Sequence, residues 1–232
     1  MANIVVLNIG GSILSPSEDN IFSFDAANRI RNFITGLPNY KFIVCVGGGF
    51  IARKYQKLLA DHSFSKNYEH EVGVASINVN AVMLQAVLGE ISEHEIIKYD
   101  DFDLESPIKF SKQVLISAAG APGHSSDWNT VKLAIRAGVK KVFSLSNIEG
   151  VYNKDPKKFA DAVMLPKLNW QEYLNLIGNP TEHLPGAKYP VDPLASRLGM
   201  ENKIEFYVLS GDNLENLTSA IKSEDFLGSV IS

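Results

Sequence analysis

The sequence predicts an α/β fold in three α/β/α layers, with a central, mainly parallel sheet. Apolar, β-branched runs recur along the chain, and helix-like patterns separate them. The runs are continuously apolar rather than alternating, which is typical of strands covered on both faces. The expected strands are Ile4–Ile9, Phe42–Val46, Val114–Ser117, Val142–Leu145 and Ile204–Leu209.

Helical spacing of apolar residues follows most of these runs. The longest expected helix is Gly73–Ile91, where Ile77, Ala81, Leu84 and Leu88 form one stripe. The stretch Asn153–Leu165 is polar and contains Asp155-Pro156, so we expect a hairpin or a loop excursion there. Shorter helices are expected after residue 50, around residues 130–137 and over Leu214–Ile221.

Composition indicates a globular chain with a sizeable core. Of the 232 residues, 45% are hydrophobic and 21% are charged, and no composition break marks a linker. The net charge of −4 argues against a general nucleic-acid binder. The first residues lack the pattern of a signal peptide, and no run approaches the ~20 apolar residues of a membrane span. We therefore expect a cytoplasmic protein, with Cys45 inert in a buried strand.

Three expected strand ends carry glycine. They are Gly10-Gly11-Ser12, Gly47-Gly48-Gly49, and Gly120 with Gly123. In a parallel sheet these ends meet at one edge, where glycine lets backbone amides approach a phosphate. Arg53 lies one helical turn beyond Gly49, so its guanidinium could bind phosphate oxygens there. The alternative is that each glycine pair makes only a tight turn. Neither the P-loop pattern nor the Gly-x-Gly-x-x-Gly fingerprint is present.

Five motifs in order resemble the amino-acid kinase superfamily, and most closely the archaeal-type UMP kinases. The resemblance covers nearly the whole chain. The motifs are Asn8–Leu14, Val46–Tyr55, Pro122–Asp127, Ser146–Pro156 and Asp192–Ala195.

The resemblance implies the amino-acid kinase fold, with one domain over residues 1–232 in an N-terminal acceptor-side lobe and a C-terminal nucleotide-side lobe. It implies transfer of a phosphoryl group from ATP to UMP, with Mg²⁺ as the partner of ATP. It also implies a homo-oligomer, since UMP kinases of this type form hexamers, and the apolar helix Gly73–Ile91 is a candidate interface.

The resemblance also implies roles for individual residues. The catalytic candidates are Asp127, Asn8 and Arg53. The candidates for binding ATP are Gly11, Ser12, Gly49 and Arg53 at the phosphates, and Ser146, Asn147, Tyr152 and Asp155 at the nucleoside. The candidates for binding the acceptor are Gly48, His70, Gly120, Ala121, Pro122, Gly123, His124, Ser125 and Ser126. No residue is expected to hold a metal ion in a dedicated site.

The chain departs from the superfamily pattern in ways that bear on activity. Asn8 stands where many members carry lysine, and a neutral hydrogen bond contributes ~1 kcal/mol against ~1.5–3 kcal/mol for a charged one. Lys54 and Lys188 are candidates to supply that charge. His70 replaces an aspartate expected to contact the acceptor nucleoside, and Asn78 stands where arginine is frequent. Ser125-Ser126 replaces two threonines but keeps both hydroxyls.

Asn8 and His70 keep two alternatives open. One is a kinase of the same superfamily with another small phosphate or carboxylate acceptor. The other is a non-catalytic nucleotide-binding storage or regulatory protein with the same fold. Arg53, Asp127, Tyr152 and Asp155 favour an enzyme that uses ATP.

Overall fold

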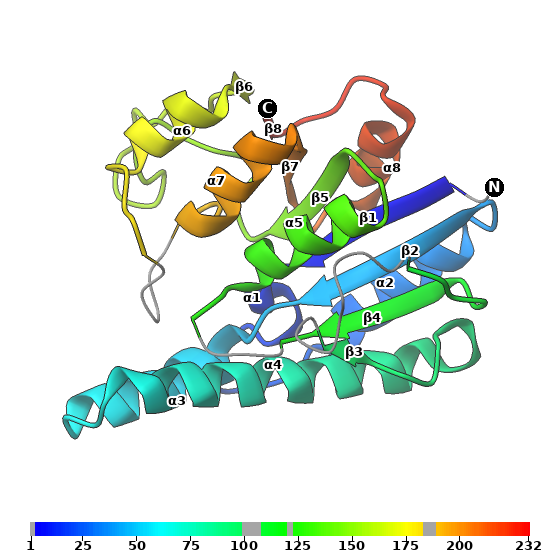
Figure 1. Cartoon of the computed structure of the whole chain (residues 1–232), viewed down its shortest axis with the longest axis horizontal. Coiled ribbons are helices and arrows are strands. Elements are labelled where there is room, and N and C mark those ends of the chain that lie inside the picture. Colours follow the sequence, from blue (N-terminus) through cyan, green and yellow to red (C-terminus); the bar gives the residue numbers. More distant parts are fainter. Residues whose placement is uncertain (1–2, 99–107, 120–122, 183–188) are drawn as a thin grey trace.

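A computed structural model describes residues 3–98, 108–119, 123–182 and 189–232. One sheet runs through it, with strands in the order β3-β4-β2-β1-β5-β7-β8-β6 (Figure 1). Neighbouring strands are parallel except β7 and β8. The strands are β1 Asn3–Ile9, β2 Tyr40–Val46, β3 Ile97–Lys98, β4 Val114–Ala118, β5 Lys141–Ser146, β6 Lys167–Leu168, β7 Glu205–Ser210 and β8 Ser229–Ile231.

Two layers of helices cover the sheet, which confirms the predicted fold class (Figure 1). One apolar core joins one face of the sheet to α1, α2, α4 and α8, and a second core joins the other face to α5, α6 and α7. The helices are α1 Gly11–Leu14, α2 Phe24–Thr35, α3 Gly49–Asp61, α4 Lys66–Leu88, the 3₁₀ turn η1 Gly89–Ile91, α5 Ser126–Arg136, α6 Trp170–Leu176, α7 Pro193–Asn202 and α8 Leu214–Lys222.

The five expected strands are all present, at the centre of the sheet. β1 pairs in parallel with both β2 and β5, and its side chains from Val5 to Ile9 are buried because helices cover both faces of the sheet. Cys45 lies in β2 and is fully buried, as predicted. Burial raises the pKa of its thiol to about 12, so the thiol stays protonated and unreactive at neutral pH.

The stretch Asn153–Leu165 leaves the sheet and returns to it as a hairpin, which is one of the two predicted structures. The Asn153 amide donates to Val163 O (3.0 Å) and the Leu165 amide donates to Val151 O (2.8 Å). An antiparallel bridge joins Tyr152 to Met164 between these bonds. The excursion carries Asp155, so its return bonds determine where that carboxylate lies.

The long helix α4 differs from its prediction at both ends. It begins at Lys66 rather than Gly73 and ends at Leu88, where η1 takes over. The segment Lys66–Ile91 is long and apolar enough to cross a membrane by length and composition. Charged, Ser, Asn and Gln residues interrupt it, so it contains no unbroken run of ~20 apolar residues. The helix packs on the sheet through Ala81, Leu84 and Leu88.

Candidate active site

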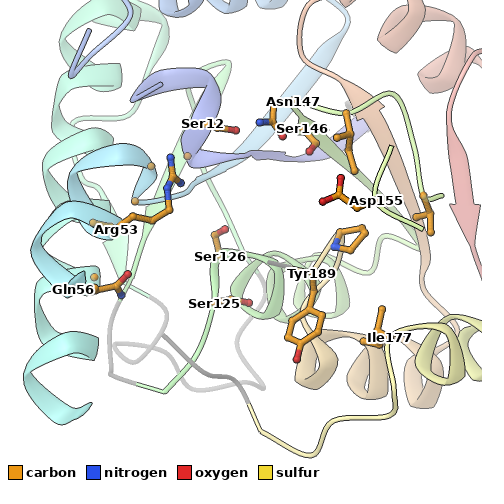
Figure 2. A pocket seen from close by; sticks show the side chains of 18 of the residues that line it. Ser12, Arg53, Gln56, Ser125, Ser126, Ser146, Asn147, Asp155, Ile177 and Tyr189 are labelled. Carbon is orange, nitrogen blue, oxygen red and sulfur yellow. The ribbon is translucent and has the colours of Figure 1, made fainter. Parts of the chain in front are cut away.

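A cleft of about 680 Å³ opens beyond the carboxyl ends of β1, β2 and β5. Figure 2 shows Arg53 and Gln56 on one wall, Ser146, Asn147 and Asp155 on the other, and Ser125 and Ser126 between them. Its position agrees with the general rule for open parallel sheets, in which ligands bind beyond the carboxyl ends of the strands.

The first two glycine loops touch each other at the base of this cleft. A Cβ atom on Gly11 would lie 2.6 Å from Gly49 Cα, and one on Gly47 would lie 2.5 Å from the Gly11 nitrogen. These neighbours are backbone atoms and cannot move aside. Gly49 also has φ +69°, a conformation that other residues rarely adopt. The two loops can therefore approach only because these positions are glycine.

The touching loops leave several backbone amides without an acceptor. Within the described part of the chain, the amides of Gly11, Ser12, Gly48 and Gly49 donate no hydrogen bond, whereas the next two amides of α3 donate to Ser15. Unsatisfied amides at the start of a helix form a site for an anion. Gly11, Ser12, Gly48 and Gly49 all line the cleft.

Arg53 adds a positive charge to this wall. Its side chain extends from α3 toward Ser12 (Figure 2) and has no ion pair or hydrogen bond with the described residues. Partial burial in the cleft lowers the pKa of its guanidinium, which still remains charged at neutral pH. Lys54 instead pairs with Glu18 (3.2 Å) and does not line the cleft, and Lys188 lies outside the described residues.

The opposite wall holds the residues for which the family resemblance implies contact with the nucleoside of ATP. Ser146 and Asn147 follow β5, and Tyr152 and Asp155 lie on the excursion; all four line the cleft. The Tyr152 hydroxyl donates to Glu149 Oε2 (3.2 Å), and burial together with this bond raises the pKa of the phenol. Asp155 Oδ1 accepts from the Lys157 amide (3.0 Å), which fixes the turn at the rim of the cleft.

Asn8 and Asp127 lie behind the cleft rather than on its surface. Asn8 is 2% exposed, and its Nδ2 donates to Asp127 Oδ1 (2.7 Å) and to Ser144 Oγ (3.2 Å). Asp127 Oδ2 accepts from the Asp192 amide (2.9 Å). Asp127 thus joins β1, the start of α5 and the start of α7. Neither Asn8 nor Asp127 is among the residues that line the cleft.

The acceptor candidates lie on two elements. His70 on α4 lines the cleft, as do Gly123, His124, Ser125 and Ser126 in the loop before α5. The remaining candidates of this loop, Gly120, Ala121 and Pro122, lie outside the described residues. Ser125 also caps α5 by accepting from the Trp128 amide (3.3 Å). Asn78 does not line the cleft, and its buried Oδ1 has no partner within the described residues.

Sequence reasoning missed several residues that line the cleft. Gln56 lies three residues after Arg53, and this helical spacing could have identified it. Lys154 and Lys157 flank Asp155 and could have been found by their charge; Lys154 pairs with Asp161 (2.5 Å). Tyr189 and Ile177 reach the cleft from segments without a recognisable motif (Figure 2), so nothing in the sequence indicated them.

The chain is similar over almost its whole length to proteins named uridylate kinase. It is 30% identical to the one from Archaeoglobus fulgidus over 98% of this chain and 99% of that protein. It is 26% identical to the one from Pyrococcus abyssi, over 95% and 96%. The crystal structure of the Archaeoglobus fulgidus uridylate kinase superposes with a TM-score of 0.76, covering 99% of this chain and 100% of that one, at 25% identity.

The fold of the chain is thus similar to that of a uridylate kinase whose crystal structure is known. The model of the amino acid kinase family matches residues 3–210, which is most of the chain. The chain belongs to the amino acid kinase family.

Proposed function

We propose that the protein transfers the γ-phosphoryl group of ATP to UMP and forms UDP and ADP. The observation that carries this proposal is that the amides of Gly11, Ser12, Gly48 and Gly49 and the guanidinium of Arg53 line one cleft, and none of them has a partner among the described residues. The names of the relatives support the choice of acceptor, because the curated proteins that resemble the whole chain are named uridylate kinase.

The chemistry requires little more than positioning and charge compensation. An oxygen of the UMP phosphate attacks the γ-phosphorus, the bond to the β,γ-bridging oxygen breaks, and ADP leaves. Two polyanions must approach, and negative charge spreads over the oxygens that are transferred. Backbone amides and Arg53 lower the energy of this arrangement without any covalent intermediate. Ser146, Asn147, Tyr152 and Asp155 hold the ATP nucleoside, and His70 with residues 123–126 holds UMP.

Mg²⁺ would enter as the partner of the ATP phosphates. The described residues contain no group of three or more His, Cys, Asp and Glu side chains that could hold a metal ion. This fits an ion bound mainly by phosphate and water, as Mg²⁺ usually is in kinases. When bound, Mg²⁺ supplies charge compensation between the phosphates.

Asn8 and Asp127 act as positioning residues in this proposal. Their bond ties the end of β1, just before the Gly11 loop, to the start of α5, just after Ser125 and Ser126. The pair therefore sets the spacing between the phosphate-binding loops and the acceptor loop. A neutral amide at position 8 performs this mechanical role without bringing positive charge to the base of the cleft.

Self-association through α4 is part of the proposal. Val79 and Val82 lie one helical turn apart on α4 and are each 56% exposed, while the opposite face of the helix is buried against the sheet. The helix cannot leave that face to enter a bilayer without opening the core, so a second copy of the chain is the occupant that fits. Burial of both valines against a second copy would remove their apolar surface from water, which favours association.

The first prediction concerns the donor phosphates. Arg53→Ala should lower kcat/KM for ATP about tenfold to a hundredfold, because a hydrogen bond with a charged group contributes ~1.5–3 kcal/mol. The melting temperature should hardly change, since Arg53 has no partner to lose among the described residues. Lys54→Ala is the matched control on the same helix and should leave the kinetics intact. Equal effects of both substitutions would show that Arg53 has no special role.

The second prediction concerns the charge at position 8. Asn8→Lys should raise kcat about fivefold, because lysine would bring positive charge to the base of the cleft. A charged hydrogen bond to the transferred phosphate would then contribute ~1 kcal/mol more than a neutral one. Asn8→Met is the control, because methionine fills a similar volume without the charge. Steady-state kinetics at saturating ATP and UMP make the comparison. A lysine variant no faster than the methionine variant would show that the site is built around the amide.

The third prediction tests the acceptor and with it the proposed reaction. Wild type with ATP should convert UMP to UDP, measured by chromatography, with a modest preference over CMP and dUMP. His70→Asp should raise kcat/KM for UMP about tenfold and sharpen that preference, because a carboxylate accepts hydrogen bonds from ribose hydroxyls or the base. His62→Asp, outside the cleft, should change neither. Failure of wild type to phosphorylate any of the three nucleotides would refute the proposed reaction.

The fourth prediction concerns the α4 surface. Val79→Glu combined with Val82→Glu should shift the protein from an oligomer to a monomer in light scattering, because two charges would be desolvated at the interface. Leu227→Glu changes a side chain that is 51% exposed elsewhere and should leave the molar mass unchanged. A wild type that is already monomeric at micromolar concentration would contradict self-association through α4.

A further inference from the structure

The second glycine loop is held from behind by a buried amide on α4. Asn80 is 2% exposed, and its Nδ2 donates to Gly47 O (2.8 Å) and to Gly48 O (3.2 Å). The residues are more than thirty positions apart in the chain, so this is a tertiary contact and not a local turn. Only the amide nitrogen can face two carbonyl oxygens, which also fixes the orientation of the Asn80 side chain.

These two bonds determine where the loop amides point. Every described peptide bond is trans, and in a planar trans peptide the carbonyl and the following N–H point in opposite directions. Because Gly47 O and Gly48 O face Asn80 on α4, the N–H groups of Gly48 and Gly49 point away from α4. These are two of the four amides that have no acceptor within the described residues.

A glycine loop needs such a restraint more than other loops do. Glycine lacks a side chain and rotates its peptide planes readily, so a loop of three glycines can turn a carbonyl oxygen into the position of an N–H. A carbonyl oxygen there would repel a phosphate. The apparent affinity for phosphate would then fall, because only the fraction of unbound protein with both N–H groups correctly oriented could bind it.

We propose that Asn80 is a positioning residue for nucleotide phosphates: it locks the Gly47–Gly48 and Gly48–Gly49 peptides with both N–H groups facing the cleft. The inference rests on the proposed function for the identity of the ligands, ATP and UMP. It assigns α4 an indirect part in phosphate binding, through the second glycine loop, in addition to its place in the core and at the exposed Val79 and Val82 surface.

The fifth prediction compares Asn80→Asp with Ser76→Ala. Aspartate has nearly the same shape but cannot donate when ionised, and it places negative charge against two carbonyls. Ser76 lies one turn earlier on the same helix, is equally buried, and donates only to Val72 O within α4 (2.7 Å). Binding of ATP, UMP, adenosine and uridine is measured by calorimetry or competition, at a temperature where all the proteins are folded.

Asn80→Asp should weaken ATP and UMP at least tenfold and leave adenosine and uridine within about twofold, because the nucleosides lack the phosphates that the amides would bind. Ser76→Ala should leave all four ligands within about twofold. Equal weakening of nucleosides and nucleotides, or no weakening, would overturn the inference while the proposed function stands. Failure of wild type to bind ATP and UMP would remove the proposed function as well.

A measurement on the wild type covers the case in which Asn80→Asp does not fold. In protein labelled at glycine, ATP with UMP should shift the backbone amide resonances of Gly48 and Gly49 and slow their hydrogen exchange. The amide of Gly138, which lies outside the cleft, serves as the reference. Unchanged Gly48 and Gly49 amides in nucleotide-saturated protein would overturn the inference.

Discussion

The contact between the two glycine loops is the constraint on which the site depends. β1 and β2 are adjacent and parallel, with Ile9 beside Val46, so both chains leave the sheet side by side. There is no room for a side chain where Gly11 meets Gly49, and the backbone itself forms the surface. That surface can present amides to an anion only if other donors occupy its carbonyls. The Ser15 amide donates to Gly11 O, and Asn80 Nδ2 donates to Gly47 O and Gly48 O.

Helix α4 contributes to the core, to the second glycine loop and to the exposed surface. Leu84 and Leu88 contribute to the core under the sheet, while Asn80 holds the second glycine loop. Val79 and Val82 remain exposed on the other side of the same helix. Burial against the sheet fixes the rotation of the helix about its axis. That rotation in turn decides that the amide faces the loop and the two valines face outward.

Charge in the site is distributed unevenly. Arg53 lines the cleft and is unpaired among the described residues, while Asp127 is bonded to Asn8 and to the Asp192 amide. A neutral amide beside a carboxylate leaves the base of the cleft less positive than a lysine would. The positive charge of the cleft therefore lies on its walls, which Arg53 and the lysines that flank Asp155 line.

The sequence by itself determined the class of fold, the five central strands and most of the cleft wall, from Gly11 and Arg53 to Tyr152 and Asp155. These features can be predicted from apolar runs and from short motifs, because a buried strand and the glycines at its end are recognisable within a few consecutive residues. Only the tertiary structure decided that Asn8 and Asp127 do not line the cleft, that α4 begins at Lys66, that Asn80 holds the second glycine loop, and that Tyr189 lines the cleft. Their positions arise from packing between segments distant in the chain, and such packing leaves no periodic or local pattern to read.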